Sequence, residues 1–484
     1  MPLRVQGRYI LDSTGSRVKL ACTNWYGAHL RSYVQGGLSL RSAEQIAADI
    51  GAMGFNCVRL SYSLEALARN PPVRQEYVSA LPNSTGRRFL DVFDEVVTTL
   101  TAQGLMVVVN NHNSDAGWCC QVNDGNGMWF SGPYPERDWT ESLRLFARRY
   151  RSNPLVIGYD LRNEVRPDIL ARTLPAWGDT VGITTPGFRS WTIHDYREAT
   201  ERAGAAVLEE NPDALIFVEV LFATMLCPFQ FKDWPLRGMD GHVVWSAHEY
   251  SFLQNFHRFA WKMCEDGFTS AEFAMRYNIY LGMSALVDLV KPVLIGVPFC
   301  MCPLVLAALL ALVSAAAFVL AYTGKSRLVA AVGVSTALPA LALAAAWSAI
   351  PCRDIDTYEA FASSRDANWG HIAAVAPVWV GEFGDDNPTD SWNWTISYLR
   401  ERDLGFAYWS VDGEHFPPTA KSFGENIPGH WQEEVYGLFE TDYKTIRHPW
   451  KLNDIRSIMT STAEAGLAAP VTPTLRHTAA HPEL

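Results

Sequence analysis

Two glutamates stand at the ends of short apolar runs in this chain. The stretch Val156-Ile-Gly-Tyr-Asp-Leu-Arg-Asn-Glu-Val-Arg-Pro167 begins as a buried strand and reaches Asn163 and Glu164 before Pro167 stops the extended run. The stretch Val378-Trp-Val-Gly-Glu-Phe-Gly384 places Glu382 in the same way. In a parallel α/β barrel, polar residues at the carboxyl ends of strands line the mouth where chemistry occurs. The prediction of function turns on these two carboxyl groups.

Eight apolar runs alternate with helical patterns, and this alternation predicts a (β/α)8 TIM barrel. The expected strands are 18–24, 55–60, 105–112, 156–164, 214–218, 243–250, 378–382 and 406–410. The expected helices are 43–53, 89–103, 141–150, 195–210, 358–374 and one that contains 396–402. Residues 5–20 alternate apolar and polar around Ser13-Thr14-Gly15, which predicts a hairpin that plugs the bottom of the barrel.

Further polar and aromatic residues follow the expected strands. Each of them alone has an ordinary explanation, such as an ion pair, a hydrogen-bonded histidine or a core tryptophan. A barrel brings all the strand ends to one mouth, so together they favour a functional site. The residues are Arg59, His112, Asn163, Glu164, His248, Tyr250, Glu382 and Trp409.

Composition limits the partners of the protein. The 484 residues suffice for one large barrel and an insertion, and a net charge of −11 argues against a nucleic-acid partner. Nine cysteines are an odd number and their spacings suggest neither a disulfide framework nor a zinc site, so they do not identify the compartment. The N-terminal residues have no secretory-signal pattern, and 461–484 is expected to be a disordered tail.

Two long apolar stretches lie after the sixth expected strand. Residues 293–322 and 328–350 each exceed the roughly 20 residues that span a bilayer. They predict two transmembrane helices within an insertion at 251–350, between barrel parts at 1–250 and 351–460; the alternative is a buried helical hairpin. The expected protein is therefore integral to the membrane. Lys325 and Arg327 lie between the spans and Lys291 and Arg353 flank them, so the side that the barrel occupies is left open.

The ordered set of eight strand-end residues resembles the active site of glycoside hydrolase family 5, the cellulase-like retaining glycosidases. Four motifs resemble a plant-type branch of that family in particular: Met53-Gly-Phe-Asn-Cys-Val-Arg-Leu60, Asn111-His112, and Gly117-Trp-Cys-Cys120 with Asp124-Gly-Asn-Gly127. The resemblance runs from about 18 to 450 and omits the apolar hairpin. The chain departs from that branch in lacking its secretion signal and in carrying the hairpin.

The resemblance implies a role for each residue. Glu382 would be the nucleophile and Glu164 the acid/base, with Arg59 and Tyr250 favouring the ionised form of Glu382. Asn163 would reach the sugar 2-hydroxyl, and His112 and His248 would bind hydroxyls or tune the carboxyls. Trp409 would offer an apolar face to the sugar, as Trp25 would. No metal or organic cofactor is implied.

The sequence therefore predicts a retaining hydrolase of β-glycosidic, and specifically β-glucosidic, bonds. Its expected partners are a β-linked glycoside or oligosaccharide and a lipid bilayer contacted through 293–350. One alternative is a glycosidase of the same chemistry acting on a glycolipid, such as glucosylceramide or a steryl glucoside. An alternative of another class is a non-catalytic, membrane-tethered sugar-binding protein, which the intact glutamate pair disfavours. The sugar, the linkage and endo or exo action remain open.

Overall fold

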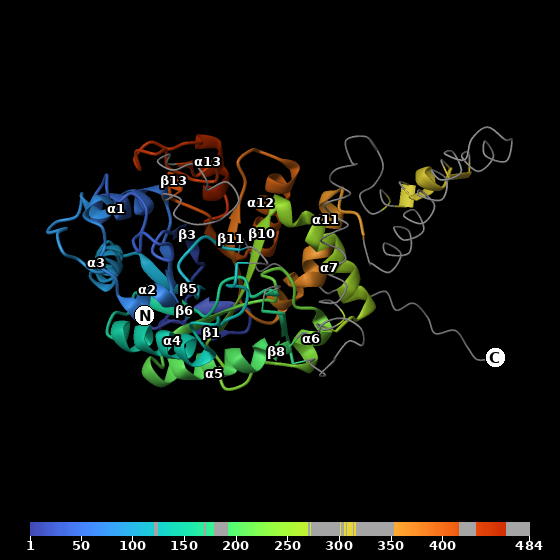
Figure 1. Cartoon of the computed structure of the whole chain (residues 1–484), viewed down its shortest axis with the longest axis horizontal. Coiled ribbons are helices and arrows are strands. Elements are labelled where there is room, and N and C mark those ends of the chain that lie inside the picture. The colour runs from blue at the N-terminus through green and yellow to red at the C-terminus, as the bar shows by residue number, and fades with distance from the viewer. Residues whose placement is uncertain are drawn as a thin grey trace, which may run out of the picture.

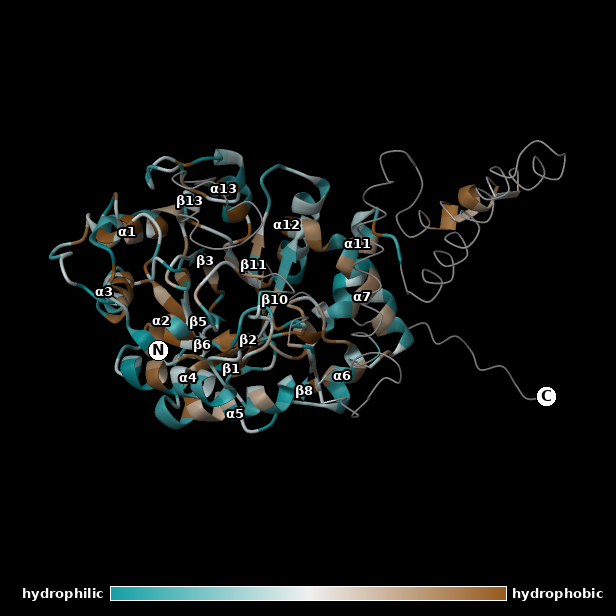
Figure 2. Ribbon diagram, in the orientation of Figure 1, coloured by the Kyte–Doolittle hydropathy of each residue, from teal (hydrophilic) through white to brown (hydrophobic). Residues whose placement is uncertain are grey.

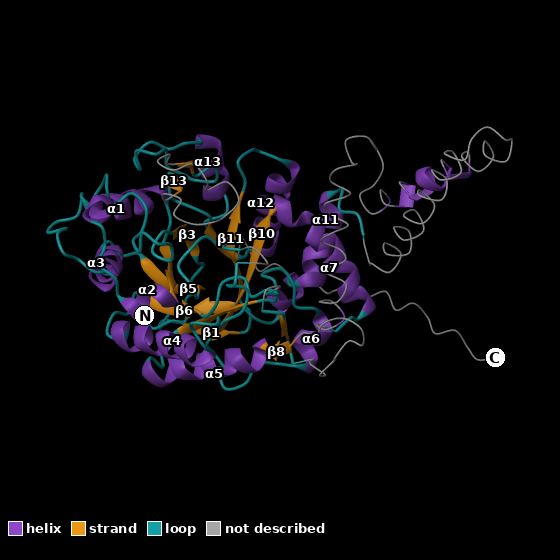
Figure 3. Cartoon of the chain, in the orientation of Figure 1, coloured by secondary structure: helices purple, strands orange, loops and turns teal. Residues whose placement is uncertain are grey.

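Eight parallel strands close into a barrel at the centre of the molecule (Figure 1; Figure 3). The structure is a computed structural model that describes residues 1–120, 124–168, 171–178, 192–269, 272, 301, 304–305, 307–312, 314–315, 353–415 and 432–460. The barrel strands, in chain order and in order around the barrel, are β3 (Ala21–Trp25), β4 (Cys57–Ser63), β5 (Met106–Asn113), β6 (Val156–Asp160), β9 (Leu215–Glu219), β10 (Val243–Tyr250), β11 (Val378–Gly384) and β12 (Gly405–Tyr408).

Helices surround the barrel and cover the outward faces of its strands (Figure 3). They are α1 (Ala43–Met53), α2 (Leu64–Arg69), α3 (Phe89–Ala102), α4 (Glu136–Tyr150), α5 (Tyr196–Glu210), α6 (Pro228–Asp233), α7 (Gln254–Asp266), α11 (Tyr358–Asn368), α12 (Asp390–Arg402) and α13 (Pro449–Arg456), with the 3-10 turns η1 (Gln75–Val78), η2 (Ser251–Leu253) and η4 (Gly370–Ala374). Helices α1, α3 and α4 each have a buried apolar stripe, and Figure 2 shows hydrophobic and hydrophilic residues mixed along the covering helices. In α1 the stripe is Ala43, Ile46, Ala47, Ile50 and Met53.

The predicted barrel is confirmed, and all eight expected strands form it. Two helices begin earlier than expected. Helix α4 begins at Glu136 after Pro135, and α12 begins at Asp390, where the Thr389 side chain accepts a hydrogen bond from the N–H of Trp392. The patterns did not predict the short parallel pair of β7 (Thr173–Ala176) and β8 (Thr192–Asp195), or the pair of β13 (Glu414–His415) and β14 (Gln432–Glu433).

The N-terminal hairpin closes the amino-terminal end of the barrel. Strands β1 (Arg4–Gln6) and β2 (Tyr9–Leu11) pair antiparallel, and a bridge from Leu11 to Arg17 closes a second turn at the expected Ser13-Thr14-Gly15. Leu3, Ile10 and Leu20 join one apolar cluster with inward-facing residues of the strands, namely Cys22, Cys57, Met106, Val108, Ile157, Leu215, Phe217, Val244, Trp379 and Ala407. The interior is therefore apolar at this end, and its polar residues lie nearer the opposite, carboxyl-terminal end.

Within the described residues, three disulfides join six cysteines, contrary to the expectation from the odd count. Cys22 and Cys57 are bonded across β3 and β4, Cys227 is bonded to Cys264 of α7, and the neighbours Cys119 and Cys120 are bonded to each other. Spacing along the chain did not reveal the first two pairs because parallel strands and a helix bring them together.

The prediction of an integral membrane protein is wrong. Across the described parts of the chain, no helix has both the length and the apolar character that crossing a bilayer requires. Most of 293–322 and all of 328–350 lie outside the described residues, and the described helical residues of the first stretch are 304–305, 307–312 and 314–315. A span needs about 20 apolar residues in one continuous helix. Hydropathy reports whether a stretch is apolar, but it does not report whether the stretch forms one continuous helix.

Candidate active site

Arg59 lies at the centre of a polar cluster above the apolar layer of the barrel. It points inward from β4, its side chain is 1% exposed, and it uses all five of its N–H donors. Their acceptors lie at 2.7–3.0 Å and come from strands β3, β6, β9 and β11 and from the loop after β6: Asn24, Asp160, Asn163, Glu219 and Glu382. One guanidinium therefore fixes the relative positions of five side chains from different parts of the chain.

Glu382 receives two hydrogen bonds, one on each carboxylate oxygen. Arg59 Nη1 donates to Oε1 at 2.7 Å, and the Tyr250 hydroxyl donates to Oε2 at 2.9 Å. Burial raises the pKa of Glu382, while the positive charges of His248 and Arg59 act in the opposite direction. The donors on both oxygens orient the carboxylate and favour its ionised form.

Glu164 lies beside Glu382 and is the more exposed of the two. Its Oε1 is 2.8 Å from Nδ1 of His248, and its side chain is 21% exposed, against 6% for Glu382. One carboxylate oxygen of Glu164, one of Glu382 and a ring nitrogen of His248 lie within 4.8 Å of one another. This spacing fits the roughly 5–5.5 Å between carboxyl groups of retaining glycosidases better than the roughly 6.5–9.5 Å of inverting ones.

Two more carboxylates lie beneath this pair, and the sequence prediction missed both. Asp160 and Glu219 are fully buried, and each forms an ion pair with Arg59. Glu219 also contacts His248 and the backbone N–H of Glu164. Burial raises the pKa of Asp160 to about 7 against the charge of Arg59, with a further upward contribution from Glu219. Both end apolar runs, as Glu382 does, so the criterion that found Glu382 would have found them as well.

His248 carries a positive charge in this cluster. Burial acts to lower its pKa, but the charges of Glu219 and Glu382 and its hydrogen bonds raise the pKa well above 6.5. His112 behaves in the opposite way: burial and the nearby His29 hold its pKa well below 6.5. At neutral pH the site therefore holds a cationic His248 and a neutral His112.

Aromatic rings form one wall of the site. Trp409 stacks on Tyr26 at 4.8 Å between ring centroids and on His112 at 5.6 Å, and Trp118 meets Trp409 edge-on at 6.3 Å. Trp25 is not part of this wall. It is fully buried in the outer core, where its Nε1 donates to the carbonyl of Gly36 at 2.9 Å.

The Cys119–Cys120 disulfide adjoins the acid side of the site. Nδ2 of Asn163 is 3.5 Å from both sulfurs, and the sulfurs lie within 4.8 Å of a carboxylate oxygen of Glu164. Because Arg59 holds Oδ1 of Asn163, the amide nitrogen must face the disulfide. Both cysteines are half-buried, so they line the open side of the site.

Two groups among the described residues have the spacing of metal ligands, namely Cys119, Cys120 and Glu164, and Glu164, His248 and Glu382. The sulfurs of the first group are joined in a disulfide and are not thiolate ligands. In the second group His248 is protonated, and a ligating histidine must be neutral. Neither group as it stands offers the deprotonated sulfur and neutral histidine ligands that a metal ion requires.

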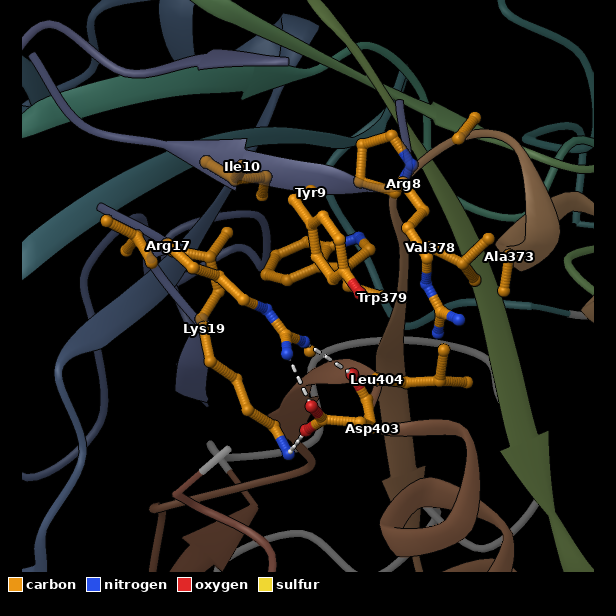
Figure 4. Close-up of a pocket in the computed structure, with 15 residues that line it drawn as sticks. Arg8, Tyr9, Ile10, Arg17, Lys19, Ala373, Val378, Trp379, Asp403 and Leu404 are labelled. Carbon is orange, nitrogen blue, oxygen red and sulfur yellow. Dashed lines mark hydrogen bonds and ion pairs between the residues drawn. The ribbon is translucent and has the colours of Figure 1, made fainter. Parts of the chain in front are cut away.

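A shallow, solvent-open groove with a volume of about 30 Å³ lies at the other end of the barrel (Figure 4). It is lined by residues that precede or begin β3, β11 and β12, including Leu20, Val378 and Gly405, and by Tyr9. Across it Asp403 is paired with Arg17 and with Lys19, the latter at 2.9 Å. These charges are already paired, and the groove shares no residue with the cluster around Glu164 and Glu382.

A parallel eight-stranded barrel with two adjacent carboxylates at its carboxyl-terminal mouth defines a class, the barrel enzymes that hydrolyse glycosidic bonds. Residues 11–284 match the model of the cellulase family, glycosyl hydrolase family 5. The match covers more than half of the chain, which belongs to this family and is a glycosyl hydrolase.

Individual relatives agree with this assignment. A glycosyl hydrolase 5 family protein of the conifer Chamaecyparis obtusa is 26% identical over 97% of this chain and 68% of its own length. The major extracellular endoglucanase of Xanthomonas campestris is 30% identical over 50% of this chain, which spans 43% of that relative. The catalytic domain of that endoglucanase superposes with a TM-score of 0.58 at 19% identity, covering 94% of this chain and 99% of the domain, and so shares the fold.

Replacing Arg59 with methionine is expected to destabilise the protein by about 3–5 kcal/mol, because three carboxylates would stay buried without their cation. Burial already raises the folded-state pKa values of Asp160 and Glu382, and without Arg59 the pKa values of all three carboxylates rise further. The loss of stability is then present above the unfolded pKa and shrinks as falling pH protonates the carboxylates. Urea unfolding at pH 5 and pH 8 should show the larger deficit at pH 8.

A matched arginine on the surface provides the control. Arg149 pairs with Asp94, and both side chains are about one-third exposed. Arg149→Met should cost no more than about 1 kcal/mol. Equal losses for the two variants, or a deficit for Arg59→Met that grows at pH 5, would contradict this view of the cluster.

Proposed function

We propose that the protein is a retaining β-glucan hydrolase in which Glu382 is the nucleophile and Glu164 the general acid/base. The observation that carries the proposal is the close pair of carboxylates, one of which has a donor on each oxygen while the other is open to solvent. Relatives named endoglucanases, from Paenibacillus polymyxa and Xanthomonas campestris, support β-glucosidic bonds as the substrate class.

The proposed reaction has two displacements. Glu382 attacks the anomeric carbon while Glu164 protonates the departing glycosidic oxygen, which gives a glycosyl ester on Glu382. Water activated by Glu164 then hydrolyses the ester. The Arg59 and Tyr250 hydrogen bonds stabilise the carboxylate that attacks and later leaves.

The remaining residues hold the sugar. The amide nitrogen of Asn163 faces the open side and is free of Arg59, so it is placed to donate to a sugar 2-hydroxyl. Trp409 supplies a ring face at the wall of the site, with Tyr26 stacked behind it. His112 is neutral and can bind a hydroxyl through Nε2, since Nδ1 lies 2.8 Å from Asn110. We do not assign a substrate contact to Trp25, which is fully buried.

The first product should have the β configuration, because two inversions at the anomeric carbon give net retention. Proton NMR during the first minutes of cellotetraose hydrolysis, before mutarotation, measures this. Early accumulation of the α anomer would overturn the double displacement and the assignment of Glu382 as nucleophile.

We also infer that the protein belongs to the plant-type branch of the family. The conifer relative aligns along nearly the whole chain, and the Gly117-Trp-Cys-Cys120 and Asp124-Gly-Asn-Gly127 motifs support the same inference. Our proposed organisation has barrel parts at 1–266 and 351–460, an intervening segment at 267–350 and a tail at 461–484, so the insertion begins later than the expected residue 251. Helix α7 packs on the barrel through Phe259 and Trp261 and is held by the Cys227–Cys264 disulfide, so we assign its residues to the barrel.

A further inference from the structure

Glu219 at the end of β9 contacts three members of the site and is itself inaccessible to substrate. Its side chain is fully buried, and Oε1 accepts a hydrogen bond from Arg59 Nη2 at 2.9 Å. Its other oxygen, Oε2, accepts from the backbone N–H of Glu164 at 2.7 Å, and Nε2 of His248 is 3.3 Å from Oε1.

The backbone contact holds Glu164 in an unusual conformation. Glu164 has φ of +43°, in the left-handed region that residues with a Cβ rarely adopt. Such a conformation costs on the order of 1–3 kcal/mol and persists only where surrounding contacts enforce it. A charged acceptor at 2.7 Å from the N–H is the stronger kind of hydrogen bond. Glu219 therefore stabilises the turn that directs the Glu164 side chain into the mouth.

Glu219 also reaches the side chain of Glu164 through His248. The imidazole lies between the two carboxylates, with Nδ1 2.8 Å from Glu164 Oε1 and Nε2 next to Glu219. Burial acts to raise the pKa of Glu219, but the charges of His248 and Arg59 and the N–H of Glu164 lower it overall. Glu219 thus stays anionic and favours the protonated form of His248, whose Nδ1 faces Glu164.

We propose that Glu219 is a positioning residue for Glu164, holding its backbone directly and its carboxyl group through His248. The inference rests on the proposed role of Glu164 as the general acid. It implies that loss of Glu219 lowers kcat/KM most on substrates whose leaving group must be protonated.

The test compares Glu219→Gln with Asp160→Asn on a series of aryl β-glucosides whose phenols differ in acidity, with a thermal-unfolding midpoint for each variant. Asp160 is the matched control, because it is buried on the same arginine at 2.7 Å and has no described hydrogen bond to Glu164 or His248. Glu219→Gln should lower kcat/KM for the least acidic phenol by about tenfold or more and spare the most acidic, since general acid catalysis contributes about 10²–10⁴-fold. Asp160→Asn should lower all members of the series by a similar factor.

Two further variants keep the outcome decisive. Glu219→Asp retains the charge facing Arg59 but moves it away from the Glu164 N–H. It should therefore also steepen the dependence of kcat/KM on the acidity of the phenol, and it serves as the test if Glu219→Gln does not fold. Glu164→Ala on the same series reports on the proposed function separately: if it shows no dependence on the leaving group, the acid role itself fails. If Glu164→Ala steepens the dependence while the folded Glu219 variants do not, or if Asp160→Asn steepens it equally, the positioning role of Glu219 is overturned.

Discussion

Glu382→Ala is expected to abolish turnover on every glycoside, whatever its leaving group. The substitution removes the group that would form the glycosyl ester, and loss of a nucleophile typically lowers kcat by on the order of 10⁴-fold or more. Glu382→Gln should be as inactive, although it keeps the shape of the side chain between Arg59 and Tyr250. Initial rates with an aryl β-cellobioside and with cellotetraose measure both variants.

A variant at another buried carboxylate of the barrel, Glu249, is the control that distinguishes a loss of catalysis from a loss of folding. Glu249 lies on β10, next to Tyr250, and is paired with Arg365 at 2.5 Å on the outer side of the strand. Glu249→Gln removes a buried charge and should lower the unfolding temperature, yet retain turnover per folded molecule. Turnover by Glu382→Ala within tenfold of the parent enzyme would rule out its role as nucleophile.

Glu164→Ala should show a different pattern. On unactivated oligosaccharides it should lose about 10²–10⁴-fold, because the glycosidic oxygen then leaves without a proton. Substrates with strongly acidic phenols need little protonation and should form the glycosyl-enzyme nearly as fast as before. The second step then becomes limiting, since no base activates water.

Azide distinguishes the two glutamates directly. It is a nucleophile that needs no general base, so it should accelerate Glu164→Ala on activated substrates and yield the β-glycosyl azide. Glu382→Ala should form no such β-azide, because it cannot make the intermediate. Product analysis by NMR decides between them, and identical responses of the two variants to azide and to leaving group would show that the roles have been assigned wrongly.

The barrel and most of its mouth could be predicted from local patterns. Apolar runs of strand length alternating with helical stripes define the eight βα units, and the closed barrel brings their carboxyl ends together. Arg59, Asn163, His248, Tyr250 and Glu382 do meet in one cluster. The same reasoning applied evenly would have added Asp160 and Glu219, which end apolar runs of the fourth and fifth barrel strands.

The direction in which a side chain points could not be predicted from the sequence where a shift of one position reverses it. Trp25 and Tyr26 are adjacent, yet Trp25 points into the outer core while Tyr26 stacks on Trp409 in the site. Successive strand residues face opposite sides, so a shift of one position exchanges them. Hydropathy likewise led to the prediction of an integral membrane protein, whereas no described helix has the length and apolar character of a span.

The sequence by itself determined the fold and the residue types at the mouth of the barrel, because both follow from periodicity and from where strands end. The tertiary structure decided how those residues act on one another. The five partners of Arg59 span positions 24 to 382, and only barrel closure brings them around a single guanidinium. Glu164 has a left-handed backbone conformation, and Glu219, which accepts the hydrogen bond from its N–H, lies 55 positions away in the sequence. Charges, donors and backbone conformation in the site depend on distances across the barrel, and no local pattern encodes those distances.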